Sequence, residues 1–383
     1  MQIVDRQALV AAKMGKTEEF QAYLHAGYQT QKKGGNKMQE HMLTAILETS
    51  YGLTDYQLSS LTSRNLVDGT CVYKTYHIQR SSPPSLVFIA CHDRLVEKST
   101  FRWERDQNVQ DWFAERVLLL RHLEQQGYPA PRVFPSRNGA ETVRHENWNI
   151  FVTTFLEGQI HLTSPDNLYL LAAAVGRLHR LALLPSIGLS WWNTTYSLPH
   201  ALRQLEACAP FIPASHQAFY DQCKRAFVTI QHALHRLPEC IIHGDVWVLN
   251  GVRTSEQEVV LIDWEGAGRG AALLDLSELL LKGQYDAYGA IPESIKEDHI
   301  AALVSGYSQW RFPEPIEREL LPDALRFRSA WVGAWRLSNV LHEGWTARIE
   351  KVFNQVQRGY RLAEPTAALA LQYFAQRDRA SLC

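Results

Sequence analysis

The sequence lacks any apolar run long enough to cross a membrane or to form the core of a signal peptide. The most apolar stretch, LYLLAAAVGRLH at residues 168–179, ends in charged residues and is far shorter than the roughly 20 residues that a spanning helix needs. The first residues, MQIVDRQALVAAKMGK, contain no apolar segment of signal-peptide length either. We therefore expect a cytoplasmic protein without a membrane partner.

An excess of charge of one sign is also missing. The chain has 39 Lys and Arg residues against 40 Asp and Glu residues, and its basic residues are scattered. Nucleic-acid binding needs a basic face, so no nucleic-acid partner is expected. The six cysteines show neither a C-x-x-C pair nor the spacing of a zinc site, so reduced thiols are expected.

The amino-acid pattern at the start of the chain predicts an appendage. Apolar residues recur at helical spacing within residues 6–26, and the polar stretch QKKGGNK at 31–37 has the composition of a solvated linker. Residues 1–36 are therefore predicted to form an N-terminal helical extension and linker. A second helix is predicted from about 38 to 52.

The remainder of the chain predicts two lobes of different character. Residues 56–94 are rich in β-forming side chains and carry a hairpin signal at Asp68-Gly69. An amphipathic helix, WFAERVLLLRHLEQQGY, and a strand at 149–158 follow, and beyond this strand the pattern is mostly helical. We expect an α+β fold with a small antiparallel-sheet lobe carrying one main helix, residues 37–157, and a larger, mostly helical lobe, residues 158–383.

The stretch IIHGDVWVLNG at residues 241–251 carries the strongest chemical signal. An apolar strand runs into His243-Gly-Asp245, and Asn250 follows five residues after the aspartate. A second apolar strand, EVVLIDW, ends in Asp263, and the short segment RTSEQE is expected to join the two strands as a hairpin. Such a hairpin would carry Asp245, Asn250 and Asp263 toward one edge.

This order of residues is the arrangement of phosphotransferases of the protein-kinase type. Asp245 is the candidate catalytic residue that would orient a substrate hydroxyl and accept its proton. Asn250 and Asp263 offer the oxygen ligands that suit Mg²⁺, and His243 is expected to brace the loop.

The match extends over residues from about 40 to 280, in the expected order, and the chain resembles the aminoglycoside phosphotransferase and choline kinase family. The segments that carry the resemblance are AERVLLLRHLEQQGYPAPRV, FVTTFLEG, AAAVGRLHRLA, HGDVWVLN and LIDWEGAGRGAALLDLSELLL.

The resemblance implies a protein-kinase-like two-lobe fold whose first lobe binds the nucleotide and whose second lobe holds the catalytic loop and the acceptor. It implies ATP, with GTP as the alternative, and Mg²⁺ as cofactors. It also assigns nucleotide-binding roles to Glu115 on the small-lobe helix and to Val152, Thr153 and Thr154 beside the adenine slot, and a buried structural role to Asp275.

One element of the family pattern is missing. The strand SLVFIACHDR has Ile89, Ala90 and Cys91 where the family has a lysine or arginine that contacts phosphate. Lys74, on the preceding strand and in phase with Val72, is the candidate replacement that would pair with Glu115.

The sequence leaves the acceptor open. The leading hypothesis is an O-phosphotransferase for a small hydroxylated substrate, either an aminoglycoside-like antibiotic, as in antibiotic resistance, or another natural product. A core-metabolic kinase of a sugar or amino alcohol is one alternative. The other is a non-catalytic, kinase-like binding or regulatory protein, which the missing lysine favours. Trp247, inside the catalytic loop, is the tryptophan expected to touch a ligand, whereas Trp331 and Trp335 have the spacing of a packed helix face.

Overall fold

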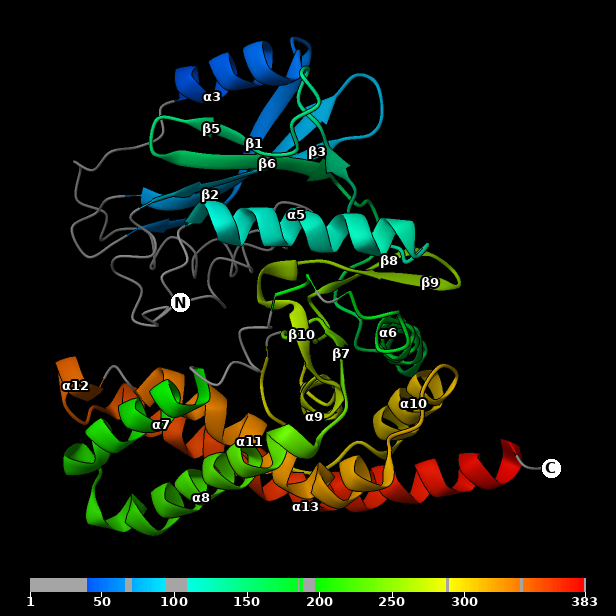
Figure 1. The fold of residues 1–383 in the computed structure, drawn as a ribbon. Coiled ribbons are helices and arrows are strands. Elements are labelled where there is room, and N and C mark those ends of the chain that lie inside the picture. Colours follow the sequence, from blue (N-terminus) through cyan, green and yellow to red (C-terminus); the bar gives the residue numbers. More distant parts are fainter. Residues whose placement is uncertain are drawn as a thin grey trace, which may run out of the picture. The chain divides into compact units, whose positions relative to one another are not determined.

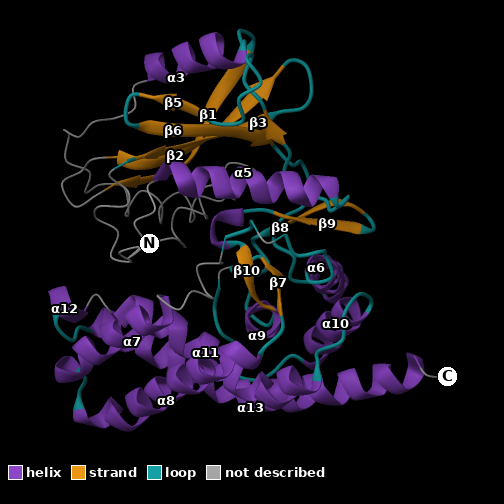
Figure 2. Ribbon diagram, in the orientation of Figure 1, coloured by secondary structure: helices purple, strands orange, loops and turns teal. Residues whose placement is uncertain are grey.

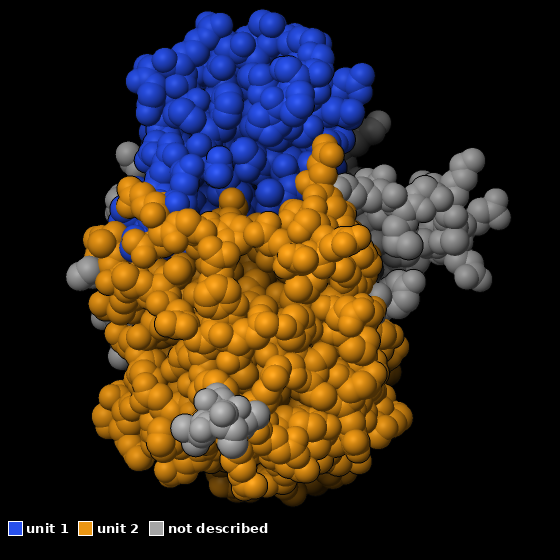
Figure 3. All heavy atoms as spheres, turned by 90° about the vertical axis from the view of Figure 1, so that its right-hand side faces the viewer, with its two compact units in different colours: residues 1–124, 131–156 blue, residues 125–130, 157–383 orange. Residues whose placement is uncertain are grey.

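A computed structural model describes residues 40–65, 71–93, 109–184, 186–188, 197–286, 289–337 and 340–381. The predicted extension, residues 1–36, lies outside the described residues. The chain divides into two compact units, drawn in different colours in Figure 3: Met1–Glu124 with Pro131–Leu156, and Gln125–Ala130 with Glu157–Cys383. The expected lobe boundary lay between residues 157 and 158, and the structure passes from one unit to the other after Leu156.

The first unit is built on an antiparallel sheet with the strand order β1-β2-β3-β6-β4, and β5 pairs with β6 (Figure 1). Successive side chains of its central strand β6 are buried at six consecutive positions, as expected where both faces of a sheet are covered. The elements of this unit are α3 (Glu40–Ile46), η1 (Leu47–Tyr51), β1 (Tyr56–Asn65), β2 (Cys71–Arg80), β3 (Leu86–His92), α5 (Val109–Gln125), β4 (Val133–Phe134), β5 (Val143–His145) and β6 (Trp148–Thr154).

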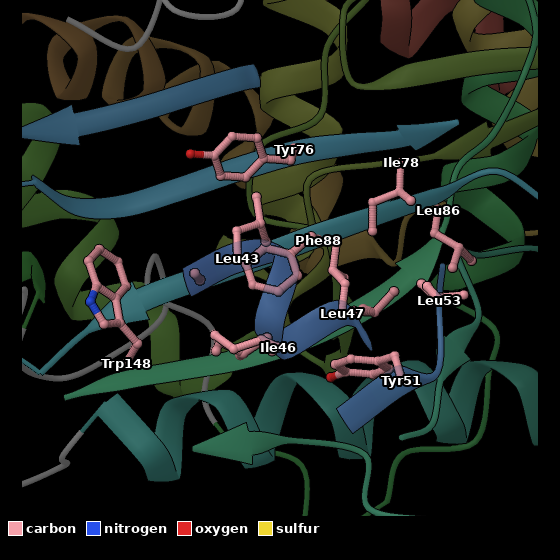
Figure 4. Close-up of a cluster of buried hydrophobic side chains, with 13 residues drawn as sticks. Leu43, Ile46, Leu47, Tyr51, Leu53, Tyr76, Ile78, Leu86, Phe88 and Trp148 are labelled. Carbon is pink, nitrogen blue, oxygen red and sulfur yellow. The ribbon is translucent and has the colours of Figure 1, made fainter. Parts of the chain in front are cut away.

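One face of this sheet packs against α3 and η1. The hydrophobic cluster there joins Leu43, Ile46 and Leu47 to side chains from β2, β3 and β6, among them the fully buried Phe88 (Figure 4). The helix expected from about 38 to 52 is shorter as an α-helix: it becomes a π-helical turn at Leu47 and stops at Gly52. There a left-handed glycine donates its N–H to the carbonyl oxygens of Glu48 and Leu47.

The other face of the sheet carries α5. Phe113 of this helix meets Phe151 of β6 edge to face, with 5.0 Å between ring centroids. Phe151 is paired in register with Ile89 of β3, so both side chains lie on the face opposite to the Phe88 cluster. The helix expected from the pattern WFAERVLLLRHLEQQGY is thus present and covers one sheet face.

The second unit is mostly helical, as the colouring of Figure 2 makes plain. No helix among the described residues is long and apolar enough to cross a membrane. Its longer helices are α6 (Pro165–Leu178), α7 (Ser197–Cys208), α8 (Gln217–Ala233), α9 (Ala272–Lys282), α10 (Glu297–Ser308), α11 (Pro315–Leu337) and α13 (Ala347–Ser381). Its short elements are α12 (Val340–Glu343), the 3-10 turns η3 (Ala209–Phe211), η4 (Ala214–His216), η5 (Leu234–Arg236) and η6 (Trp264–Gly266), and the strands β7 (Glu239–Ile242), β8 (Gly251–Ser255), β9 (Glu258–Leu261) and β10 (Gly268–Ala271).

The expected pairing of the two apolar strands in this unit is wrong. The strand before the His-Gly-Asp motif, β7, pairs with β10, and the strand before Asp263, β9, pairs with β8. The segment RTSEQE, expected to connect β7 with β9, overlaps the end of β8, whose sequence is GVRTS. The segment GVRTS forms β8 because its backbone completes a hairpin with β9 and its Val252 is buried there.

The cluster between the sheet and α3 allows a direct test of what holds the first unit together. Replacing Phe88 with alanine should lower the free energy of unfolding by about 3–5 kcal/mol, because it removes a fully buried ring and leaves a cavity. Leu118→Ala on α5, where the leucine is 37% exposed, serves as the control and should change it by about 0.5 kcal/mol or less. Urea denaturation measures both values, and equal effects would contradict this account of the core.

Candidate active site

The loop between β7 and β8, residues 243–250, is held by a buried carboxylate on α9. Asp275 is completely buried and accepts the backbone N–H groups of His243 at 2.6 Å and Gly244 at 2.8 Å. Gly244 has a φ of 78°, a backbone conformation that favours glycine. The strand therefore turns sharply at this glycine, and Asp245 follows at the turn.

Asp275 is itself stabilised in its ionised form. His179, directly after the end of α6, contacts it through Nε2 at 3.2 Å, and the other ring nitrogen of His179 lies 2.9 Å from the hydroxyl of Tyr307. Burial alone would raise the pKa of the Asp275 carboxyl, but the hydrogen bond and charge of His179 and the loop N–H groups together hold this pKa below its ordinary value. This supports the structural role that the resemblance assigned to Asp275.

His243 also braces the loop. Its Nε2 donates to the carbonyl oxygen of Ile262, at 2.9 Å, and its ring meets Trp264 edge to face at 4.8 Å. Burial lowers the pKa of His243, so the ring is neutral at pH 7. The contact ties the start of the catalytic loop to the end of β9, where Asp263 follows.

Asp245 and Asn250 are in direct contact, as their spacing suggested. The side-chain amide of Asn250 donates to the backbone oxygen of Asp245 at 2.6 Å and to its carboxylate Oδ2 at 2.9 Å. The amide oxygen of Asn250 is the atom that a metal-binding role requires, because the nitrogen already faces Asp245.

The β8–β9 hairpin places Asn250 beside the start of the Asp263 segment. Gly251 pairs with Leu261, and one residue further the N–H of Ile262 donates to the backbone oxygen of Asn250 at 2.9 Å. Asp263 comes next and has a φ of 67° and a ψ of 60°, which is uncommon for a residue with a side chain. Such strained backbone is found at functional sites, where the surrounding structure imposes it. The three predicted residues are thus brought together, although by a hairpin other than the expected one.

Three polar residues of α9 line the catalytic loop, and sequence reasoning missed two of them. Asp275, Glu278 and Lys282 are spaced three and four residues apart, so they share one face of an otherwise apolar helix. Glu278 accepts the N–H of Val246 at 3.2 Å, and the ammonium nitrogen of Lys282 lies 3.1 Å from Oδ1 of Asp245. The sequence DLSELLLK already indicated Glu278 and Lys282, because they follow Asp275 at helical spacing and so lie on the same side of the helix.

The structure does not bring Lys74 to Glu115. Lys74 shares its strand face with Tyr76, to whose hydroxyl it donates at 3.0 Å, and this is the face covered by α3. Glu115 lies on α5, which packs on the opposite face. The alternation of side chains along β2 therefore places Lys74 on the face away from α5.

The predicted adenine-slot segment lies at the end of β6. Val152 and Thr153 are buried in the sheet, and Thr153 pairs with both β3 and β4. The backbone N–H of Thr154 donates to Arg132, at 2.8 Å, and that of the next residue, Phe155, donates to Ser85. Recognition of adenine by this segment would therefore depend on its other backbone groups.

The fold and the catalytic loop define the class of the protein: a protein-kinase-like enzyme that transfers a phosphoryl group to an alcohol group of a small molecule. A comparison with protein families matches residues 93–351, more than half of the chain, to the phosphotransferase enzyme family that includes the aminoglycoside phosphotransferases. The chain belongs to this family. No curated protein matches the sequence.

Solved structures of the same fold support the assignment of the architecture. An amicoumacin kinase is 15% identical, with a TM-score of 0.61 over 85% of this chain and 94% of its own. A microcompartment-associated aminopropanol kinase is 16% identical, with a TM-score of 0.59 over 87% and 99%. An aminoglycoside phosphotransferase from Alicyclobacillus acidocaldarius is 17% identical, with a TM-score of 0.56 over 91% and 99%. The expected protein-kinase-like fold is confirmed.

The buried Asp275 leads to a prediction about stability and pH. Asp275→Asn should lower the free energy of unfolding by on the order of 3 kcal/mol near neutral pH. The substitution removes the negative charge and replaces one of the two carboxylate oxygens by an NH2 group. At least one of the three donors, the N–H groups of His243 and Gly244 and the ring of His179, then loses its acceptor. Asp298→Asn, at an exposed aspartate of α10, is the matched control and should cost less than about 1 kcal/mol.

The sign of the pH dependence follows from the lowered pKa. A carboxyl whose folded-state pKa is depressed stabilises the fold fully above its unfolded-state pKa and loses this effect as the pH falls through the folded-state pKa. The difference in the free energy of unfolding between wild type and Asp275→Asn should therefore be constant above about pH 5 and become smaller as the pH falls below about 4. Denaturation curves over this range provide the measurement, and a difference that does not change down to acid unfolding would contradict it.

Proposed function

We propose that the protein is an ATP-dependent O-phosphotransferase in which Asp245 is the catalytic base. The observation that carries this proposal is the contact of Asp245 with Asn250 just before the β8–β9 hairpin, after which Asp263 follows with its positive φ. Asp245 accepts the proton of the acceptor hydroxyl, whose oxygen attacks the γ-phosphorus of ATP. The bond to the leaving oxygen breaks in line, and ADP departs.

Asn250 and Asp263 are the proposed ligands of Mg²⁺. Their oxygens fit this ion, which binds through one or two protein oxygens and completes its octahedron with water and substrate phosphates. In the part of the chain that the structure describes, no cluster of three or more His, Cys, Asp or Glu side chains offers a self-sufficient metal site. A bound Mg²⁺ would neutralise charge on the phosphates during transfer. The amicoumacin kinase structure contains AMP-PNP and Ca²⁺, and a spectinomycin phosphotransferase structure contains ADP, which supports a nucleotide site here.

The acceptor belongs to the hydroxylated small molecules. Proteins of similar structure include kinases named for the antibiotics amicoumacin and spectinomycin and one named for aminopropanol. Both an antibiotic and a metabolite are therefore candidate acceptors. The position of Lys74 away from α5 favours, on its own, the non-catalytic alternative. The constellation of Asp245, Asn250 and Asp263 outweighs it, because a binding protein needs no base beside a metal-ligand pair.

A nucleotide-binding measurement tests the metal ligands before any acceptor is known. The melting temperature of the wild type should rise with ATP or GTP only when Mg²⁺ is present, since a ligand at a hundredfold excess over its Kd stabilises the folded state by about 2.7 kcal/mol. Asp263→Asn should lose most of this shift, whereas the control Asp298→Asn should keep it. No Mg²⁺-dependent shift with either nucleotide in the wild type would support the non-catalytic alternative.

Loss of the base should separate binding from chemistry. Asp245→Asn is expected to reduce kcat for phosphoryl transfer by about 10²–10⁴, because the acceptor proton no longer has a carboxylate to receive it. The Mg²⁺-dependent shift in melting temperature should persist in this variant. Turnover is measured as ADP release over a broad panel of hydroxylated compounds, and wild-type rates in Asp245→Asn would remove Asp245 from the mechanism.

A further inference from the structure

The carboxylate of Asp245 carries an internal counter-ion. Lys282, the last residue of α9, places its ammonium nitrogen 3.1 Å from Oδ1 of Asp245 and 2.5 Å from Oε1 of Glu278. The Lys282 side chain is only 17% exposed, so this cation is held in place rather than extended into solvent. Any acceptor whose hydroxyl touches Asp245 therefore comes within a few ångströms of a fixed positive charge.

The second carboxylate of this group is neutralised as well. Glu278 is buried and forms an ion pair through Oε2 with the buried guanidinium of Arg328 on α11, and the same oxygen accepts the N–H of Val246. The two carboxylates, Asp245 and Glu278, are thus matched by the two cations Lys282 and Arg328. This group presents no uncompensated negative charge to a ligand, although a polycationic acceptor requires such charge.

The groups beside Asp245 are also hydrogen-bond donors, which disfavours an acceptor molecule with an ammonium group at this position. The ring of Trp247 lies beneath the Lys282 ammonium, with 5.5 Å from nitrogen to ring centroid, and is 6% exposed. Among the residues that the structure describes, none accepts a hydrogen bond from the indole N–H of Trp247. An indole N–H and an ammonium group can only donate, so an ammonium group placed beside them on the acceptor can satisfy neither. Hydroxyl, carbonyl or carboxylate oxygens can satisfy both.

From these contacts we infer that Lys282 selects the acceptor by charge: the substrate is an alcohol that carries no ammonium group beside the hydroxyl to be phosphorylated. This inference rests on the proposed function, because it takes Asp245 as the group that the hydroxyl touches. If Lys282 acts in this way, the acceptor of this protein differs from the acceptors of kinases that act on amino alcohols or polyamine antibiotics. Polyols, sugars and hydroxy acids are the class that fits.

The size of the effect follows from Coulomb's law. Two like charges about 5 Å apart repel each other strongly enough to change a binding or rate constant by a factor of roughly 4 at the permittivity of water and of roughly 200 at the effective permittivity near a protein surface. Because Lys282 is also paired with two carboxylates, we expect the lower part of this range, about tenfold. A difference of this size is easily resolved in kcat/KM.

Sets of related acceptors that differ in one substituent, which is neutral, ammonium or carboxylate, provide the test. One set is glucose, glucosamine and glucuronate, and a smaller set is propylene glycol, isopropanolamine and lactate. At neutral pH, the wild-type kcat/KM for the ammonium member of a set should be about tenfold or more below that of its neutral partner. Lys282→Met should shrink this gap by about tenfold. Lys282→Arg, which keeps the charge, is the matched control and should preserve the order of the acceptors.

The outcomes distinguish this inference from the proposed function. A wild type that prefers the ammonium member, or a gap that is the same in wild type and Lys282→Met, overturns the inference and leaves the kinase assignment intact. A Lys282→Met protein that does not fold, as seen in its melting curve, leaves the wild-type order of acceptors as the deciding result. Absence of transfer to every acceptor, while Mg²⁺-nucleotide still raises the melting temperature, overturns the proposed function and this inference with it.

Discussion

The buried carboxylate of Asp275 is the contact on which the rest of the second unit's chemistry depends. It binds two consecutive backbone N–H groups of the catalytic loop and the ring of His179, at a position from which water is excluded. Without it, those N–H groups would be buried and unpaired, which costs about 1–3 kcal/mol for each group. The sharp turn at Gly244 and the position of Asp245 are therefore fixed by a helix that lies some thirty residues further along the chain.

The same helix continues this role over its next two turns. Glu278 holds the backbone at Val246, and Lys282 reaches the side chain of Asp245. A side chain positioned by a helix, as that of the proposed base Asp245 is, is held more accurately than one on an unsupported loop, because the helix is itself locked by packing. In α9 this packing is provided by leucines, which are buried on the remaining sides of the helix. The apolar residues of α9 thus fix its position, and its polar stripe fixes the loop.

Periodicity and turn signals in the sequence predicted the secondary structure that depends on neighbouring residues. The amphipathic helix α5 and the antiparallel pair of β1 and β2 follow from periodicity and from the hairpin signal at Asp68-Gly69. The mispaired hairpin shows where this approach fails, since β7 and β9 have equally apolar sequences and only packing determines which strand each one meets. Lys74 fails for a related reason: alternation gives the phase of a side chain but not which face of the sheet receives α5.

The amino-acid order alone established the class of chemistry, because an aspartate, an asparagine and a second aspartate at these spacings are the groups that phosphoryl transfer needs. It also established the succession of a sheet-rich and a helix-rich part. The electrostatic surroundings of Asp245, the proposed base, are decided only by the folded chain. Lys282, Glu278 and Arg328 are separated from Asp245 by 33 to 83 residues, and charges so distant in sequence meet only when helices pack against one another. Coulomb interactions depend on distance in space, which the linear order of residues does not contain.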